Sequence, residues 1–253
     1  MTISVAGGTL APVTDRPESV DFYFDVMCPY AYQSSKWIRE VRARTGVAVR
    51  WRFFSLEEIN RVDGKKHPWE RPWSYGWSQM RIGAWLRRPS AADTGADDGN
   101  LRLDRWYETV GRAFHEEGRQ PHDPVVHRAI LDDLGFGAGL LDEAMADPST
   151  TDEVRADHDR AVQVYGAFGV PTIVFPPAAG DDVTGTAVYQ QLVPAPTGAD
   201  AVELFDLTVA FNRFPQLFEL RHPKRVSDLA SVVETFEPYL RARAWNTIEN
   251  PAP

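Results

Sequence analysis

The chain has 253 residues, a formal net charge of −9 and a hydrophobic fraction of 43%. This length suits one large domain or a core domain with a sizeable insertion, and the hydrophobic fraction suffices for an ordinary buried core. An acidic chain repels phosphate backbones, so nucleic-acid binding is not expected. The sequence has no run of about 18 apolar residues, so a membrane span is not expected either.

Cysteine usage indicates the redox compartment. Cys28 is the single cysteine, so an internal disulfide is excluded. This usage fits a reducing compartment, and we expect a cytoplasmic protein. The first residues carry neither a basic segment nor an apolar run of signal-peptide length. We expect residues 1–17 to form a flexible tail.

The N-terminal segment predicts a strand, a helix and a second strand. Residues 19–25 are rich in β-forming side chains and predict the first strand. Pro29 suits the first turn of a helix, and apolar positions at helical spacing predict that helix over 29–44, with Gly46 ending it. Residues 47–54 predict the second strand. This order is typical of a right-handed parallel βαβ unit.

A block of helices follows. Apolar periodicity predicts helices over 74–87, 101–117, 124–134, 139–146 and 151–168, with a polar surface loop over 89–100. Asp123 before Pro124 is a typical helix N-cap. His115, His122 and His127 share no helix face, so we expect surface or capping roles for them and no metal site.

β character returns in the last third of the chain. Residues 171–175 and 187–193 predict strands, and the cluster Gly180-Asp181-Asp182 predicts a hairpin with a long loop between them. Residues 199–213 and 227–244 predict two further helices. One small mixed sheet with helices on its faces explains this order most economically, so the predicted fold class is α/β.

The position of Cys28 suggests thiol chemistry. The residue lies between the end of the first predicted strand and the first turn of the first helix. Free backbone N–H groups and the positive end of the helix dipole favour the thiolate there, and the thiolate is the reactive form. We therefore predict an exposed, activated sulfur, although a lone cysteine is usually a small buried hydrophobe.

Two segments carry a family resemblance. Phe-Asp-Val-Met-Cys-Pro-Tyr-Ala-Tyr over 24–32 resembles the active-site turn of DsbA-type thioredoxin-fold proteins. Gly-Val-Pro-Thr-Ile-Val-Phe over 169–175 resembles the second signature of that family, a loop with a cis proline before a strand. The resemblance covers most of the chain and is closest to the actinobacterial branch of mycothiol-dependent reductases. The run over 211–220 is similar to that branch as well.

The resemblance implies a domain layout. The expected parts are a DsbA-type thioredoxin-like core over 18–60 and 169–225, a helical insertion over 61–168, and a C-terminal helix and tail over 226–253.

The resemblance also implies a site. The turn of Cys28, Pro29, Tyr30 and Ala31 is expected to face Val170 and Pro171 across a cleft, with the Val170–Pro171 bond cis. A cis proline leaves the preceding backbone free to pair with an extended ligand. Apart from the resemblance, the basic and aromatic segment that contains Trp69 and Trp73 has two interpretations: it closes over the sulfur and contacts a sugar or carboxylate of the ligand, or its tryptophans form core of the insertion.

The sequence departs from the dithiol pattern at Ala31, where a resolving cysteine would stand. Cys28 therefore has no internal attacker that could release a mixed disulfide. The resemblance implies a monothiol cycle with a low-molecular-weight thiol, mycothiol in an actinobacterial host, and a small-molecule thiol or disulfide substrate without a metal.

Two other functions stay open at this point. In a kappa-type glutathione transferase or a chromene-carboxylate isomerase, Cys28 would hold the thiolate of a cofactor through a hydrogen bond. In a non-catalytic module, the turn would only bind a thiol ligand or a partner protein.

Overall fold

The computed structural model describes residues 16–177 and 185–242. In this part of the chain the strands form one four-stranded mixed sheet in the order β2-β1-β3-β4. β1 (Ser19–Phe24) pairs in parallel with β2 (Ala48–Phe53). β3 (Thr172–Phe175) is antiparallel both to β1 and to β4 (Thr186–Tyr189). The predicted mixed sheet is therefore present.

α1 (Pro29–Thr45) connects the two parallel strands, as the sequence predicts. It begins directly after Cys28, its N-cap, and Pro29 takes the first helical position, where a missing N–H costs nothing. Gly46 ends the helix in the left-handed conformation with a φ of 77°, which glycine adopts without steric cost.

The helical block lies between β2 and β3. Its elements are α2 (Leu56–Ile59), η1 (Pro68–Glu70), α3 (Trp77–Arg87), α4 (Asp98–His115), α5 (Pro124–Asp133), α6 (Leu140–Ala146) and α7 (Ser149–Tyr165). α4 begins three residues before the predicted start. The carboxylate of Asp98 accepts hydrogen bonds from the backbone of Thr94 and Gly95, so the acidic end of the predicted loop starts the helix.

Helices cover both faces of the sheet. The ring of Phe24 stacks on Tyr107 of α4 with centroids 3.9 Å apart. The neighbouring Tyr23 meets Tyr165 of α7 edge-on at 6.3 Å. Successive side chains of a strand point to opposite faces, so α4 lies on one side of β1 and α7 on the other. Large aromatic side chains fill the interior, and Trp37, Trp51, Trp77 and Trp106 are all at most 1% exposed.

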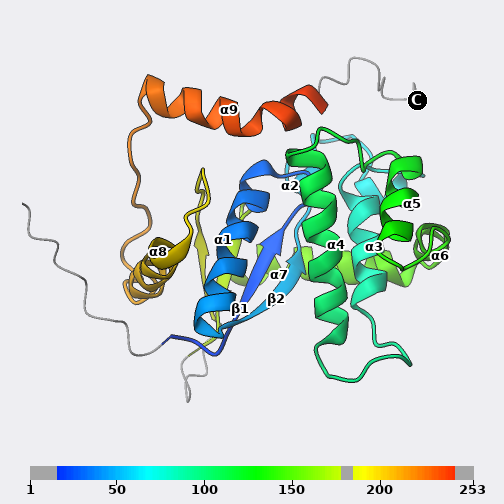
Figure 1. The fold of residues 1–253 in the computed structure, drawn as a ribbon, viewed down its shortest axis with the longest axis horizontal. Coiled ribbons are helices and arrows are strands. Elements are labelled where there is room, and N and C mark those ends of the chain that lie inside the picture. The colour runs from blue at the N-terminus through cyan, green and yellow to red at the C-terminus, as the bar shows by residue number, and fades with distance from the viewer. Residues whose placement is uncertain (1–15, 178–184, 243–253) are drawn as a thin grey trace, which may run out of the picture.

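The C-terminal part extends from the sheet to the far side of α1. β4 ends at Tyr189, four residues before the predicted end, and the next residue, Gln190, accepts a hydrogen bond at its carbonyl from Ser34 of α1. α8 (Gly198–Phe211) then packs on α1, and α9 (Val226–Ala242) packs on α4 (Figure 1). An exposed segment over 212–225 joins them.

Some predictions lie outside the described residues, namely the Gly180-Asp181-Asp182 loop and most of the N-terminal tail. Arg16, at the start of the described chain, pairs with Asp206 of α8 at 2.6 Å. No described helix combines the length and the apolar character that a membrane crossing requires.

Candidate functional site

Cys28 lies where β1 passes into α1. Its Sγ accepts a hydrogen bond from the backbone N–H of Ala31 at 3.4 Å and donates one to the carbonyl of Val170 at 3.4 Å. The Val170–Pro171 peptide bond is cis. The structure thus brings together two segments that are 142 residues apart in the chain, and Pro29 and Ala31 belong to the same turn as the sulfur.

The sulfur is buried, which corrects the prediction of an exposed and activated thiolate. Cys28 is 5% exposed and belongs to the main hydrophobic core. Burial raises the pKa of its thiol to about 12; the Ala31 N–H lowers it and the nearby charge of Asp25 raises it. The backbone N–H groups of Ala31 and Tyr30 at the helix terminus lower the pKa, but too little to offset the loss of water around an anion.

A buried carboxyl group, Asp25, supports the turn. Its Oδ1 accepts from Met27 N at 2.9 Å and its Oδ2 from Leu56 N at 2.7 Å, and its carbonyl accepts from Cys28 N at 3.0 Å. A Cβ at Gly76 would lie 3.0 Å from Oδ1, so the glycine leaves room for the carboxyl. Burial raises the pKa of Asp25 to about 7, although both backbone bonds lower it. In the sequence, Asp25 could have been identified as an acidic residue that stands between the end of an apolar strand and the cysteine.

Two tyrosines lie near the sulfur. Burial raises the pKa of Tyr189, and the neighbouring Cys28 and Tyr30 raise it further. The Tyr189 hydroxyl accepts from the Gln191 amide at 2.5 Å. Tyr30 was expected beside the ligand from its place in the turn, whereas Tyr189 was missed because only the pairing of β4 with β3 brings it there.

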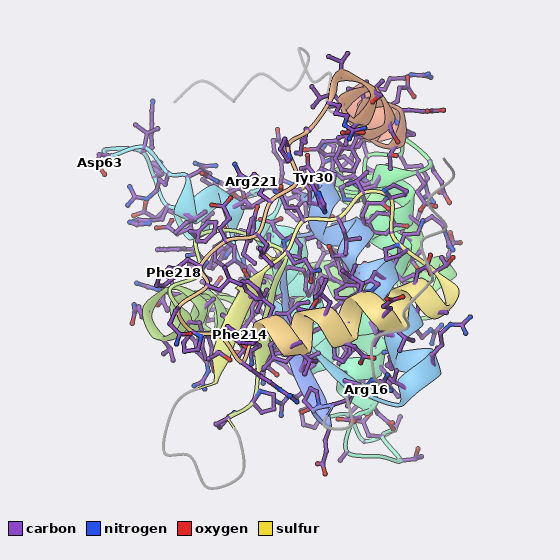
Figure 2. All side chains as sticks on the ribbon, turned by 90° about the vertical axis from the view of Figure 1, so that its left-hand side faces the viewer. Arg16, Tyr30, Asp63, Phe214, Phe218 and Arg221 are labelled. Carbon is purple, nitrogen blue, oxygen red and sulfur yellow. The ribbon has the colours of Figure 1, made fainter. Side chains whose placement is uncertain are left out.

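The C-terminal segment also reaches this end of the molecule. Figure 2 shows it running past Phe214, Phe218 and Arg221 toward Tyr30. The Nζ of Lys224 lies 5.6 Å from the centroid of the Tyr30 ring. Phe236 of α9 meets the same ring edge-on at 5.0 Å. Tyr30, which belongs to the Cys28 turn, is therefore packed against the C-terminal segment and α9.

The three histidines are buried, so the prediction of surface or capping roles is wrong. They are at most 3% exposed, and burial lowers the pKa of His115 and His127 to about 4. His127 accepts from Trp106 Nε1 at 2.9 Å, and the ring of His115 stacks on Tyr32. Aromatic and backbone partners therefore stabilise neutral imidazoles, and the described residues hold no cluster of metal ligands.

The two tryptophans assigned to the ligand have other neighbours. Trp69 stacks on His67 with ring centroids 4.3 Å apart, and the Nε1–H of Trp73 donates a hydrogen bond to the carbonyl of His122 at 2.9 Å. Among the described residues, no hydrogen bond or ring contact joins either side chain to the Cys28 turn. Their role in ligand binding stays a prediction.

The sequence of this chain is similar to those of known proteins. The family model Rv2466c-like, described as mycothiol-dependent nitroreductase Rv2466c, matches residues 27–222. The uncharacterized protein Rv2286c of Mycobacterium tuberculosis is 47% identical over 230 residues, which are 91% of this chain and 93% of that protein. The 2-hydroxychromene-2-carboxylate isomerase of Sphingobium xenophagum is 25% identical over 170 residues, 61% of this chain and 87% of that enzyme.

A solved structure gives the same fold. A 2-hydroxychromene-2-carboxylate isomerase superposes with a TM-score of 0.50 at 17% identity and covers 78% of this chain and 95% of its own. The thioredoxin-like fold with a helical insertion, expected from the resemblance, is confirmed.

Proposed function

We propose that this chain, which belongs to the Rv2466c-like family of mycothiol-dependent nitroreductases, is a monothiol oxidoreductase that acts through Cys28 on a low-molecular-weight thiol. The observation that carries the proposal is the contact of Cys28 Sγ with the Val170 carbonyl beside Pro171, in a chain with no second cysteine. Ala31 cannot resolve a mixed disulfide, so a second thiol molecule must do so.

The proposed cycle has two exchange steps. The Cys28 thiolate attacks one sulfur of a mixed disulfide, a bond to Cys28 forms, the S–S bond of the substrate breaks, and the leaving thiolate takes a proton from water. A second thiolate then attacks the outer sulfur of the Cys28 adduct. The Cys28 bond breaks, and Cys28 leaves as a thiolate. One disulfide is consumed and one is formed, so no other oxidant or reductant is needed.

Access to the sulfur is part of this proposal. Cys28 must leave the Val170 carbonyl and reach water before it ionises, because burial holds its pKa near 12. The N–H of an extended ligand then has a free acceptor at the Val170 carbonyl. Ligand binding would thus replace the contact that keeps the thiol neutral.

The groups near the sulfur suit a hydroxyl-rich thiol. Tyr189 is 38% exposed, and its hydroxyl and the exposed Gln191 amide are neutral hydrogen-bonding groups. Such groups match the sugar and inositol hydroxyls of mycothiol. We therefore propose mycothiol as the thiol, held between Tyr30, Tyr189 and the Val170 backbone.

The test is intact mass spectrometry after incubation with mycothiol disulfide. One adduct per chain, mapped to the peptide that contains Cys28 and removed by added mycothiol, is the expected result. Cys28→Ser should form no adduct and show no turnover. A wild-type chain that stays unmodified after prolonged incubation with mycothiol disulfide would refute the proposal.

The buried neutral thiol also supports a second candidate, a thiol-dependent transferase or isomerase. A thiol with a pKa near 12 can donate a hydrogen bond to the thiolate of a bound cofactor without acting as a nucleophile. In that case Cys28→Ser should keep measurable turnover with a thiol and an electrophile, because serine also donates. Ligand affinity without turnover in both proteins would indicate a binding module.

A further inference from the structure

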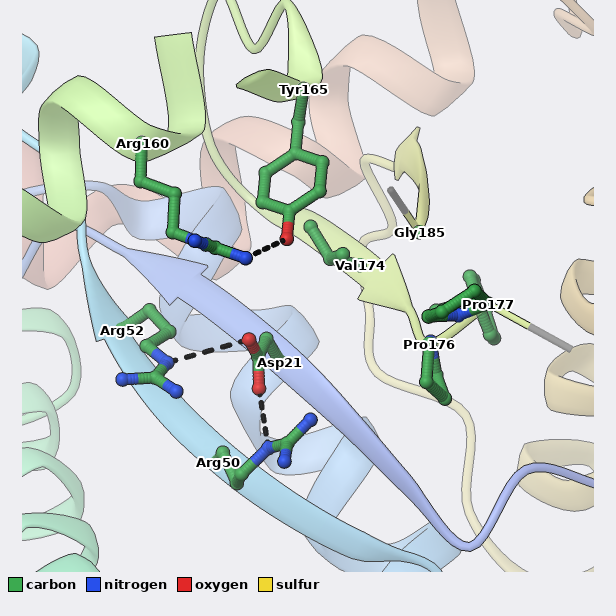
Figure 3. Close-up of a pocket in the computed structure, with 10 residues that line it drawn as sticks. Asp21, Arg50, Arg52, Arg160, Tyr165, Val174, Pro176, Pro177 and Gly185 are labelled. Atoms are coloured by element: carbon green, nitrogen blue, oxygen red, sulfur yellow. Dashed lines mark hydrogen bonds and ion pairs between the residues drawn. The ribbon is translucent and has the colours of Figure 1, made fainter. Parts of the chain in front are cut away.

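A hollow lies on the sheet face that α7 covers, opposite the face packed against α4. Its volume is about 430 Å³. Figure 3 shows Asp21 of β1, Arg50 and Arg52 of β2, and Arg160 and Tyr165 of α7 around it. An apolar wall of Val174, Pro176 and Pro177 lines one side. The site is polar on one flank and apolar on the other.

Two of the three guanidinium groups in this hollow, those of Arg50 and Arg52, pair with one carboxylate, that of Asp21. Arg50 Nε lies 2.6 Å from Asp21 Oδ1, and Arg52 Nε lies 3.4 Å from Asp21 Oδ2. Arg52 also approaches Asp157 at 3.6 Å, but that carboxylate is already paired with Arg87 at 2.5 Å. The lining residues therefore leave a local excess of positive charge in a chain whose net charge is −9.

Arg160 is the cation of the hollow with the fewest partners. Its guanidinium forms no ion pair within the described residues and donates only to the Tyr165 hydroxyl, at 3.0 Å. The side chain of Arg50 is 48% exposed, so part of its fork also faces solvent. A guanidinium presents five N–H donors in a planar fork that matches the oxygens of a phosphate. The Tyr165 hydroxyl accepts from Arg160 and can donate its own proton to a bound oxygen.

We propose that this hollow binds a small phosphate monoester, with its phosphate between Arg50 and Arg160 and its carbon body on the apolar wall. The lining charge of three cations and one anion favours a dianion over a monoanion. Nothing in this proposal uses Cys28, which follows the opposite end of β1 and contacts the Val170 loop.

Phenyl phosphate is a suitable probe, because it joins a dianion to a small apolar ring. Isothermal titration of the full chain at low salt should show saturable binding at one site, weaker with benzoate and absent with phenol. Affinity should fall as salt is added, because the attraction is screened. A wild-type chain without saturable binding at concentrations up to about 10 mM, the weak end of specific affinities, refutes the site.

Variants distinguish binding in the hollow from nonspecific attraction to positive charge elsewhere on the surface. Arg160→Ala and Arg50→Ala should each lower the affinity for phenyl phosphate by about tenfold or more, which is the effect of losing one charge-assisted hydrogen bond. Arg155→Ala is the matched control on the same helix, since Arg155 pairs with Asp159 at 3.6 Å and does not line the hollow. Equal affinity in all three variants, with unchanged thermal unfolding, overturns the proposal. Cys28→Ser should bind like the wild type, so this test is independent of the redox function.

Discussion

Replacing Asp25 by asparagine should change how the stability of the chain depends on pH. Burial raises the pKa of Asp25 from 3.8 to about 7 in the folded protein. At pH values well below 4 the Asp25 carboxyl is protonated in both the folded and the unfolded chain, so its ionisation does not change the free energy of unfolding. Between pH 4 and 7 the unfolded chain releases the proton while the folded chain retains it, so the stability of the folded state falls as pH rises. A pKa rise of this size corresponds to a loss of about 3 kcal/mol between pH 4.5 and 7.5.

Asparagine keeps the size of the side chain but does not ionise, so this loss should vanish. Its single acceptor oxygen leaves either Met27 N or Leu56 N without a partner, which costs about 1–3 kcal/mol at every pH. Relative to the wild type, Asp25→Asn should therefore gain about 3 kcal/mol of stability from pH 4.5 to 7.5. Urea unfolding followed by tryptophan fluorescence at both pH values measures this change. A difference between the two proteins that is the same at both pH values would refute a raised pKa at Asp25.

Two further predictions concern the turn and its packing. The alkylation of Cys28 by iodoacetamide should be far slower in the folded than in the urea-unfolded chain at pH 8, and its rate should keep rising about tenfold per pH unit above pH 9. A plateau near pH 9 in the folded chain would contradict the buried thiol. Gly111→Ala should lower the free energy of unfolding by about 1–3 kcal/mol, because the new Cβ would overlap the Tyr32 ring. Gly139→Ala, with no atom within 4 Å of its Cβ, is the control and should be much milder in the same urea titration.

Local signals were sufficient for most of the fold. The ends of α1 follow from Pro29 and Gly46, which act on their own turn of backbone and need no distant partner. α2 and η1 span only four and three residues, too few for a periodic pattern, and were not predicted. The end of β4 was predicted four residues too late, because the apolar residues Leu192 and Val193 extend the β-forming pattern beyond Tyr189, the last residue that pairs with β3.

The candidate site was predicted less completely than the fold. Two short segments sufficed to pair Cys28 with Val170, since each resembles one signature of the same family. The exposure of the sulfur depends on side chains from other elements, so an argument from the helix dipole alone gave the wrong answer. Tyr189 comes beside Cys28 only through the β3–β4 pairing, and no local pattern marks it.

In the proposed cycle, burial of the thiol has a purpose in a protein that lacks a second cysteine: it limits the reaction of Cys28 with disulfides that are not substrates. An exposed thiolate at position 28 would react with any disulfide, and because Ala31 cannot release the adduct, each such adduct would need an external thiol to remove it. Because burial raises the pKa of the thiol to about 12, very little of it is ionised at neutral pH, so disulfides that do not bind in the site react slowly. A ligand that occupies the Val170 carbonyl and frees the sulfur removes this restraint for itself alone. Selectivity would then come from binding next to Pro171 rather than from the intrinsic reactivity of the thiol.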